Sequence, residues 1–228
     1  MHNFVKIAAL FFLSLCVLAS CGKGVRIETT DKSYSTDTIF VDAKIPKIVG
    51  LGNKSLEENI NEEYREVLED LLEDFSENAR ETGDKSTFTI QTTEHYNKNG
   101  FFSVVTQVNS CTKNTHKSCR RITKNIDTRL LKEVSLSDLF EGDSYIDMIN
   151  ARLLETVEKD SEKFSGLWEK PKLSGNQDFY IDEDNLVLCY PPYELSYYER
   201  GYVEIPLSIS DMSGYLKSEY QNLVKNVR

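Results

Sequence analysis

The sequence predicts an α+β fold of two sheet-plus-helix halves in which the strands run mainly antiparallel. Three observations lead to this prediction. Segments in which apolar and polar residues alternate, as in half-buried strands, occur in both halves of the 228-residue chain. One long amphipathic helical pattern stands in the first half, and a shorter helical region stands in the second. Two hairpin-like strand pairs argue against a sheet that is parallel throughout.

The first half is expected to begin with a polar tether over residues 21–37, because this stretch has no apolar period. A strand should follow, ended by Pro46 and Gly50. Its buried face is formed by alternate residues, namely Ile39, Val41, Ala43 and Ile45.

A helix of about seven turns should come next. Ser55 and Glu58 fit a capping box with Ser55 as the N-cap, and Gly83 is expected to close the helix. Its apolar stripe recurs at steps of three and four, at Leu56, Ile60, Tyr64, Val67, Leu68, Leu71, Leu72, Phe75 and Ala79.

A hairpin is predicted from two alternating segments around a turn at residues 97–100, and a further strand is expected over 121–127. The second half should contain a helical region that opens at Ser135 and continues to Val157. Three more strands and a short closing helix are expected after it, over 179–181, 186–190, 202–207 and 212–224.

These elements divide the chain into four parts. Residues 1–20 form a signal peptide and 21–37 the tether, followed by an N-terminal domain over 38–120 and a C-terminal domain over 121–228.

The signal peptide is indicated by an apolar run, Ile7 to Leu18, that follows Lys6 and leads into Ala19-Ser20-Cys21. This run is shorter than the roughly 20 apolar residues that a membrane-spanning helix needs. A cysteine directly after Leu-Ala-Ser resembles a bacterial lipobox, and the resemblance implies that Cys21 becomes the lipidated first residue. The mature protein is therefore expected at the extracytoplasmic face of the cell membrane or outer membrane.

The chain is acidic, with 37 Asp and Glu against 27 Lys and Arg and a net charge of −10. Removal of residues 1–20 takes away Lys6 as their only charged residue, so the net charge becomes −11. An acidic surface repels nucleic acid and attracts cationic partners. No nucleic-acid partner is therefore expected.

The cysteines that remain after Cys21 predict one disulfide. Cys111 and Cys119 bracket a short polar loop, and a disulfide is chemically permitted outside the membrane. The alternative is a metal site that adds His116, but no fourth ligand is evident and the spacing fits no zinc motif. No metal or other cofactor is therefore expected. Cys189 lies in an apolar run and is interpreted as a small buried side chain.

No catalytic motif occurs in the chain, and we expect a protein that is not an enzyme. The segment from Tyr190 to Gly201 instead stands out, because it holds four tyrosines, two prolines and two glutamates. Tyrosine supplies rigid contact area with a polar tip, and such loops recur at binding surfaces. The alternative is a structural corner whose rings fold onto the core, and both interpretations remain open.

The same segment resembles a known family. Pro192-Tyr193-Glu194-Leu195, with Tyr198 and Gly201 after it, is similar to the P-Y-E-I-A-P-Y-A-A-G signature. This signature marks the C-terminal extracytoplasmic domain of the lysozyme-binding anti-sigma factors of the RsiV type. The sequences Ile45-Pro46-Lys47-Ile48 and Asn59-Ile60-Asn61 resemble the N-terminal companion domain of these proteins, which also precedes the catalytic part of some peptidoglycan deacetylases. The likeness spans about residues 38 to 210.

The resemblance implies a membrane-anchored binding module whose ligand is lysozyme, another cell-wall-associated protein or a wall glycan. It implies ligand contacts at Pro192, Tyr193, Glu194, Tyr197, Tyr198 and His116. Three features depart from the family. Ser196-Tyr197 replaces Ala-Pro, the cysteine-bracketed loop replaces a Gly-Gly-Ala-His stretch, and a lipoprotein signal replaces the sigma-binding part with its membrane span. No sigma factor is therefore expected as a partner. The alternatives are an accessory part of a peptidoglycan-modifying enzyme and a structural envelope protein.

Overall fold

The computed structural model describes residues 24–113 and 117–224. The expected signal peptide, Cys21 and His116 lie outside these residues. Within the described ranges, no helix combines the length and the apolar character needed to cross a membrane.

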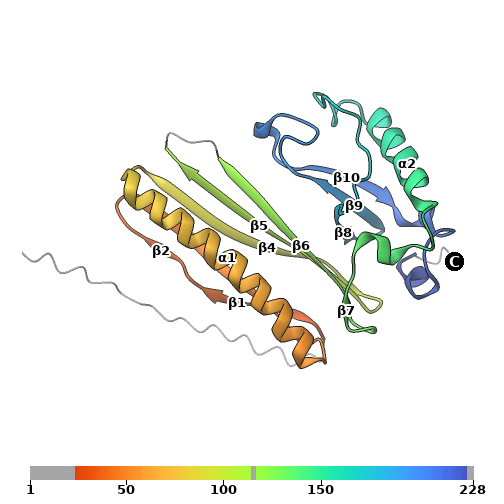
Figure 1. Ribbon diagram of the computed structural model, residues 1–228, viewed down its shortest axis with the longest axis horizontal. Coiled ribbons are helices and arrows are strands. Elements are labelled where there is room, and N and C mark those ends of the chain that lie inside the picture. Colours follow the sequence, from red (N-terminus) through yellow and green to blue (C-terminus); the bar gives the residue numbers. More distant parts are fainter. Residues whose placement is uncertain (1–23, 114–116, 225–228) are drawn as a thin grey trace, which may run out of the picture.

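The larger sheet contains seven strands in the order β1-β3-β4-β5-β6-β7, with β2 also paired to β3. All neighbours are antiparallel except β3 and β4, which are parallel and are joined by the long helix α1, Lys54–Thr82. Figure 1 shows α1 lying along one face of this sheet. The strands are β1 (Arg26–Asp31), β2 (Tyr34–Ser35), β3 (Ile39–Val49), β4 (Ser86–Lys98), β5 (Phe101–Thr112), β6 (Ser118–Asp127) and β7 (Lys132–Glu133).

The smaller sheet has three antiparallel strands in the order β10-β9-β8. They are β8 (Asp178–Asp182), β9 (Asn185–Tyr190) and β10 (Val203–Ser208). Helix α2, Tyr145–Lys159, buries Ile149 and Leu153 in one core with the inner residues of this sheet, Leu188 and Ile205 among them. The predicted α+β fold with mainly antiparallel strands and a long helix in the first half is confirmed.

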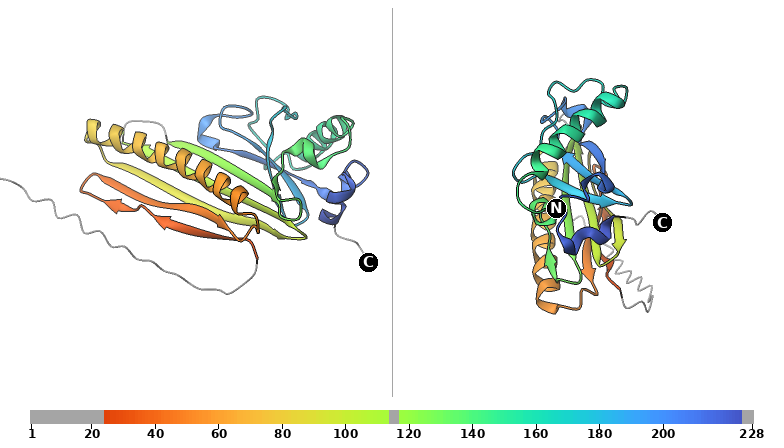
Figure 2. Two further views of the ribbon diagram at one scale, coloured as in Figure 1. Left: turned by 60° about the horizontal axis from the view of Figure 1, so that its bottom comes forward. Right: turned by 90° about the vertical axis from the view of Figure 1, so that its right-hand side faces the viewer.

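Alternation along the strands builds four layers, in the order α1, larger sheet, smaller sheet, α2 (Figures 1 and 2). Phe102 and Val104 of β5 share a core with α1. Val105, the next residue along β5, points to the opposite face and packs against the smaller sheet. In β9, Leu188 faces α2 while Cys189 packs with Val105. Each sheet is thus buried on both faces over part of its length, so successive residues of a strand must both be apolar there.

The N-cap of the long helix lies two residues before the expected one. Asn53, in an extended conformation, is the N-cap, and its side chain accepts the backbone N–H of Leu56 at 3.1 Å. The Ser55 capping box is therefore wrong, because Asn53 already satisfies a free N–H of the first turn. Gly83 closes the helix with φ 64°, as predicted, since a left-handed C-cap favours glycine.

The segment expected to be a tether contains two strands, β1 and β2, which pair with β3. Strand β1 is nearly all exposed. A strand at a sheet edge without a buried face has no apolar alternation, so its sequence resembles a linker. Strand β3 also continues through Pro46, because its pairing with β4 ends at Ala43 and leaves the strand open on that side.

Two further elements differ from expectation. The closing helix is replaced by two 3₁₀ turns, Ile209–Met212 and Ser218–Leu223, since Ser213 and Gly214 between them favour turns over a helix. The helical region after Ser135 is a 3₁₀ turn, Leu136–Leu139, that precedes α2. The expected division at residue 120 stays a prediction, but it falls inside β6, which pairs along its length with β5.

A buried polar network joins the two sheets. The Ser103 hydroxyl donates to Asn125 Oδ1 at 2.5 Å and accepts the backbone N–H of Ile181 at 3.0 Å. The Asn125 amide donates to the carbonyl of Phe179 at 2.7 Å. Two side chains on the face of the larger sheet therefore satisfy backbone groups at the free edge of β8, which a further strand would otherwise have to cover.

A second contact lies further along the same interface. Arg121 of β6 forms an ion pair with Glu204 of β10, and the Tyr180 hydroxyl donates to the same carboxylate at 2.9 Å. The Arg121 guanidinium also lies 4.8 Å from the centre of the Tyr202 ring. Because the Glu204 carboxylate accepts from both partners, its charge is compensated inside the interface.

Replacement of Asn125 by alanine should destabilise the protein by about 2 kcal/mol, because it leaves the buried Ser103 hydroxyl and Phe179 carbonyl without their partner. Urea unfolding of the purified protein measures this loss. Asn78→Ala on the exposed side of α1 is the control, with an expected change within about 0.5 kcal/mol. Equal stability of the two variants would contradict the role of the network.

Candidate binding surface

The candidate site centres on the tyrosine loop, defined here as residues 191–201 between β9 and β10. Tyr193 adopts φ 72°, a left-handed conformation that is uncommon for a bulky residue. Its side chain nevertheless remains 60 % exposed. Backbone strain of this kind persists only when the surrounding structure holds it, and it concentrates at ligand sites.

The tyrosine loop is held in place by its own buried residues and by hydrogen bonds to the segment that ends at Trp168. Leu195 and Ser196 are buried, and the Trp168 backbone N–H donates to the Leu195 carbonyl at 3.0 Å. The Trp168 indole N–H donates to the carbonyl of Glu194 at 3.2 Å. Arg200 donates from its guanidinium to two carbonyls of the Trp168 segment. The loop is therefore held in one conformation before any ligand arrives.

Three aromatic side chains remain exposed on this support. Tyr197 is 67 % exposed, and Trp168, which packs edge-to-face against it with ring centres 4.9 Å apart, is 44 % exposed. The Tyr193 ring lies 5.1 Å from that of Tyr198. We call Trp168, Tyr193 and Tyr197 the aromatic surface. The sequence pattern around Trp168 did not single it out, and only its contact with Tyr197 reveals its place in this surface.

The tyrosine loop also contacts the free edge of β6. The Tyr198 hydroxyl accepts the backbone N–H of Cys119 at 3.1 Å. Tyr202, directly after the loop, accepts the backbone N–H of Arg121 on its hydroxyl at 3.0 Å. These two phenols take the place of a neighbouring strand, since edge N–H groups otherwise remain open to unwanted pairing. The structure thus brings the tyrosine loop and the end of the Cys111–Cys119 segment together.

A groove of about 720 Å³ opens beside Tyr198. Its floor is the uncovered back face of the larger sheet, and its wall is formed by Tyr198 and Glu199. The floor carries hydroxyl, amide and thiol groups, from Thr87, Thr89, Asn109, Cys111 and Cys119. Sequence reasoning did not find the threonines and the asparagine, because alternating polar residues on a strand give no sign of what lies opposite them.

Glu194 is one of two glutamates of the tyrosine loop, and it is exposed. Partial burial and the negative charge of Asp178 raise the pKa of its carboxyl above the usual range. Among residues 24–113 and 117–224, no group of three His, Cys, Asp or Glu side chains is arranged to hold a metal ion.

The predicted Cys111–Cys119 disulfide is not formed in the structure, where Cys111, Cys119 and Cys189 are all free thiols. The strand register explains this result. Cys119 lies opposite Asn109, two residues before Cys111, so the two cysteines occupy diagonal positions. Diagonal Cα atoms are roughly 7–8 Å apart, beyond the usual span of a disulfide. Cys189 is buried as predicted, and burial raises the pKa of its thiol to about 12.

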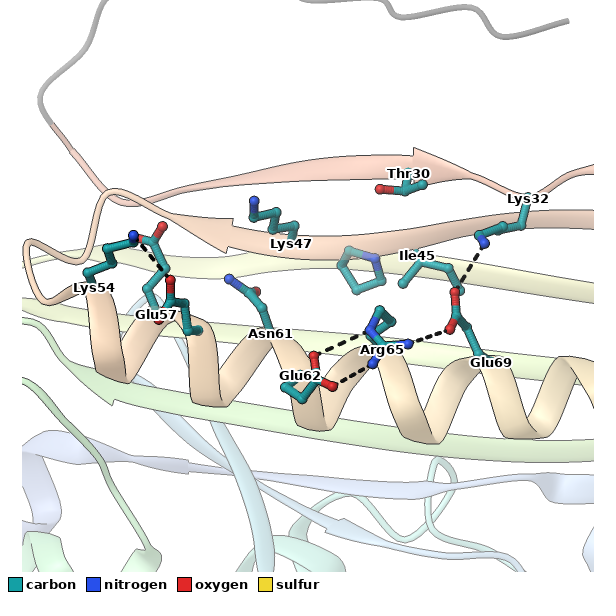
Figure 3. Close-up of a pocket in the computed structure, with 12 residues that line it drawn as sticks. Thr30, Lys32, Ile45, Lys47, Lys54, Glu57, Asn61, Glu62, Arg65 and Glu69 are labelled. Atoms are coloured by element: carbon teal, nitrogen blue, oxygen red, sulfur yellow. Dashed lines mark hydrogen bonds and ion pairs between the residues drawn. The ribbon is translucent and has the colours of Figure 1, made fainter.

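Another groove lies between α1 and the strands β1 and β3 (Figure 3). Its charged side chains pair with one another: Lys32 lies 3.1 Å from Glu69, and Arg65 lies 2.8 Å from the same carboxylate. Asn61 binds both the N–H and the carbonyl of Ile48 at 2.7 Å and so completes the open side of β3. These contacts explain the groove as part of the helix–sheet packing.

Comparison with known proteins shows a likeness to the DUF3298 family. Residues 137–210 match the sequence pattern of a family described as a protein of unknown function (DUF3298). The chain is 26% identical over 197 residues to the anti-sigma-V factor RsiV of Bacillus subtilis (strain 168), which covers 80% of this chain and 67% of RsiV. The expected likeness to RsiV is thus confirmed, and the link to peptidoglycan deacetylases stays a prediction.

Two solved structures share the fold. A DUF3298 family member from Bacteroides fragilis NCTC 9343 is 16% identical with a TM-score of 0.62, and the match covers 86% of this chain and 96% of that one. A DUF3298 family protein from Pseudomonas aeruginosa PAO1 is also 16% identical, with a TM-score of 0.64 and coverage of 90% and 100%.

In native protein, Cys111 and Cys119 should react with an alkylating reagent without prior reduction, and Cys189 should react only after unfolding. The reason is that Cys111 and Cys119 are half-exposed free thiols, whereas Cys189 is buried with a raised pKa. Burial also raises the pKa of Cys119, so its reaction should be the slower of the two. Intact mass and peptide mapping measure the order. If both residues were labelled only after reduction, Cys111 and Cys119 would be shown to form the predicted disulfide.

Proposed function

We propose that this chain is a non-enzymatic binding module of the cell envelope that captures a cationic, cell-wall-associated protein of the lysozyme class on its aromatic surface. The module is held at the extracytoplasmic face of the membrane by a lipid on Cys21. The likeness to an anti-sigma factor supports a binding or regulatory role. The resemblance of Pro192, Tyr193 and Glu194 to the signature of lysozyme-binding members supports the ligand class.

The observation that carries this proposal is the exposure of Tyr193 and Tyr197 on a strained and well-anchored loop. A structural corner would fold these rings onto the core, as it does with Tyr190. Instead the fold keeps two phenol rings and an indole in water, where they contribute nothing to the core. Rigid aromatic side chains lose little entropy on binding, so they suit the centre of an interface.

Charge supports a cationic partner. The whole chain has a net charge of −10, and Glu194 and Glu199 of the tyrosine loop are exposed beside the aromatic rings. A basic protein would be attracted to this field, and its arginine and lysine side chains can stack on tyrosine and tryptophan faces. Association should therefore slow as the salt concentration rises.

A wall glycan is the second candidate ligand, because the floor of the groove beside Tyr198 carries polar side chains. Its floor offers hydroxyl and amide groups from Thr87, Thr89 and Asn109, and such groups exchange hydrogen bonds with sugar hydroxyls. Titration with a chitin oligosaccharide separates the two candidates. If the groove is a glycan site, the oligosaccharide should bind, and Thr89→Val and Asn109→Ala should weaken that binding. If the ligand is a protein, the oligosaccharide should not bind.

Truncation of Tyr193 or Tyr197 to alanine should weaken lysozyme binding by about 30-fold, which corresponds to about 2 kcal/mol for a central interface residue. Titration calorimetry of the mature protein with lysozyme measures the change. Phe40→Ala removes a comparably exposed ring (51 %) from β3 and should leave the affinity unchanged. If both tyrosine variants fold and still bind lysozyme tightly, the aromatic surface is not part of the interface.

Replacement of Cys21 by alanine should release the protein from the membrane or block processing of its precursor, because two acyl chains hold a protein stably and no acyl chain remains. Metabolic labelling with a fatty-acid analogue, followed by membrane fractionation, tests this expectation. Cys16→Ala, within the expected signal peptide, is the control and should keep the label. Label that persists on the Cys21→Ala protein would disprove the anchor.

A further inference from the structure

The end of the larger sheet opposite the tyrosine loop is formed by two adjacent turns. Asn99 and Gly100 join β4 to β5, and residues 128–131 join β6 to β7. The Thr128 N–H donates to the Gly100 carbonyl at 2.9 Å. Gly100 lies so close to Arg129 that a Cβ on it would meet the Arg129 Cδ at 2.3 Å. The two turns therefore form one packed tip of the larger sheet, at its right-hand end in Figure 1. The 3₁₀ turn Ser218–Leu223 packs beside this tip, since Asn99 donates to the Asn222 carbonyl and Arg129 to the Glu219 carbonyl.

The polypeptide enters the fold at this same end. Gly24 is the first described residue, and the carbonyl of Val25 accepts the side-chain amide of Asn97, at the end of β4, at 2.8 Å. Cys21 stands three residues before Gly24. Three residues span at most about 11 Å when fully extended. A lipid on Cys21 would consequently hold the bilayer close to the tip.

Two leucines project from this tip. Leu130 is 50 % and Leu131 is 36 % exposed, and Leu131 adopts φ 54°, where glycine or asparagine would be favoured. The turn is rigid, because the buried Asp127 carboxylate accepts the N–H groups of Arg129 at 2.8 Å and Leu130 at 2.9 Å. The fold thus holds two adjacent apolar side chains in water at the end of the molecule where the chain enters.

Basic side chains flank the leucines. Arg129 precedes them, Lys132 follows them, and Lys98 is exposed on the neighbouring turn. Acidic groups are also present: Asp127 pairs with Arg129, and Asp138 lies 3.5 Å from Lys132. Glu219 is exposed close to Arg129, and exposed Glu133 follows Lys132, so the leucines are flanked by basic and acidic side chains together. Apolar side chains flanked by Lys and Arg are typical of segments that lie at a lipid headgroup boundary.

We propose that the Leu130–Leu131 turn enters the headgroup region of the bilayer and makes the protein stand upright on the membrane. This inference rests on the proposed lipid anchor at Cys21. Strand β5 runs 12 residues from Phe101 at the tip to Thr112 at the opposite end, which corresponds to about 37 Å. The aromatic surface lies beside that opposite end, through the contact of Tyr198 with Cys119. The second membrane contact therefore fixes the direction in which the aromatic surface faces, away from the bilayer.

Fluorescence quenching in vesicles tests the orientation. The chain has one tryptophan, Trp168, on the aromatic surface, so a Trp168→Phe, Leu130→Trp variant places the only indole at the tip. Both this variant and the wild type are prepared as full lipidated protein in vesicles of phosphatidylethanolamine and phosphatidylglycerol. Lipids brominated near the headgroup should quench the indole of the variant and shift its emission to the blue. Trp168 of the wild type should keep its emission.

The outcomes separate the tip from the anchor. Lipidated, membrane-bound protein whose tip indole is not quenched would overturn the upright orientation and leave the anchor intact. Protein without lipid on Cys21 would overturn both. A lipidated Leu130→Ser, Leu131→Asn variant gives a second measurement, since it should transfer between vesicles faster than the wild type. Asn suits the left-handed position 131, so this variant should fold. An unchanged transfer rate would also contradict the inference.

Discussion

The junction of Ser103, Asn125 and the edge of β8 determines how the two sheets sit against each other. A three-stranded sheet has two edges, and each edge exposes backbone groups that need partners. Here the N–H of Ile181 and the carbonyl of Phe179 find them on side chains of the larger sheet. These groups are buried, so the alternative to this junction is an unsatisfied edge inside the protein rather than an edge in water.

The candidate binding surface depends on this junction. Once β8 is fixed on the face of the larger sheet, β9 and β10 follow by antiparallel pairing, and the loop between them reaches the start of β6. There the hydroxyls of Tyr198 and Tyr202 accept the edge N–H groups of β6. The tyrosines nearest the sheet are thereby used for structure, whereas Tyr193 and Tyr197 stay exposed. The structural interpretation of the tyrosine segment thus applies to Tyr198, and a binding role for Tyr193 and Tyr197 stays a proposal.

Several features could be predicted because they depend on neighbours along the chain. The alternation of Val41 and Ala43, the apolar stripe of α1, the left-handed cap at Gly83 and the turn at Asn99-Gly100 all follow from local geometry. Strand β1 could not be found in this way, since an exposed edge strand has no buried face. The competition between Asn53 and Ser55 as the N-cap was decided by a single hydrogen bond to Leu56.

The sequence by itself determined the fold class, the long helix and the tyrosine segment as a candidate site, because periodicity and residue type report which side chains are buried and where turns occur. The tertiary structure alone decided that Trp168 stands beside Tyr197, that Cys111 and Cys119 lie on a diagonal, and that Leu130 shares an end with the entering chain. The physical reason is that these relations join residues far apart in sequence or depend on strand register, and a shift of two residues in register changes which side chains meet while leaving every local pattern intact.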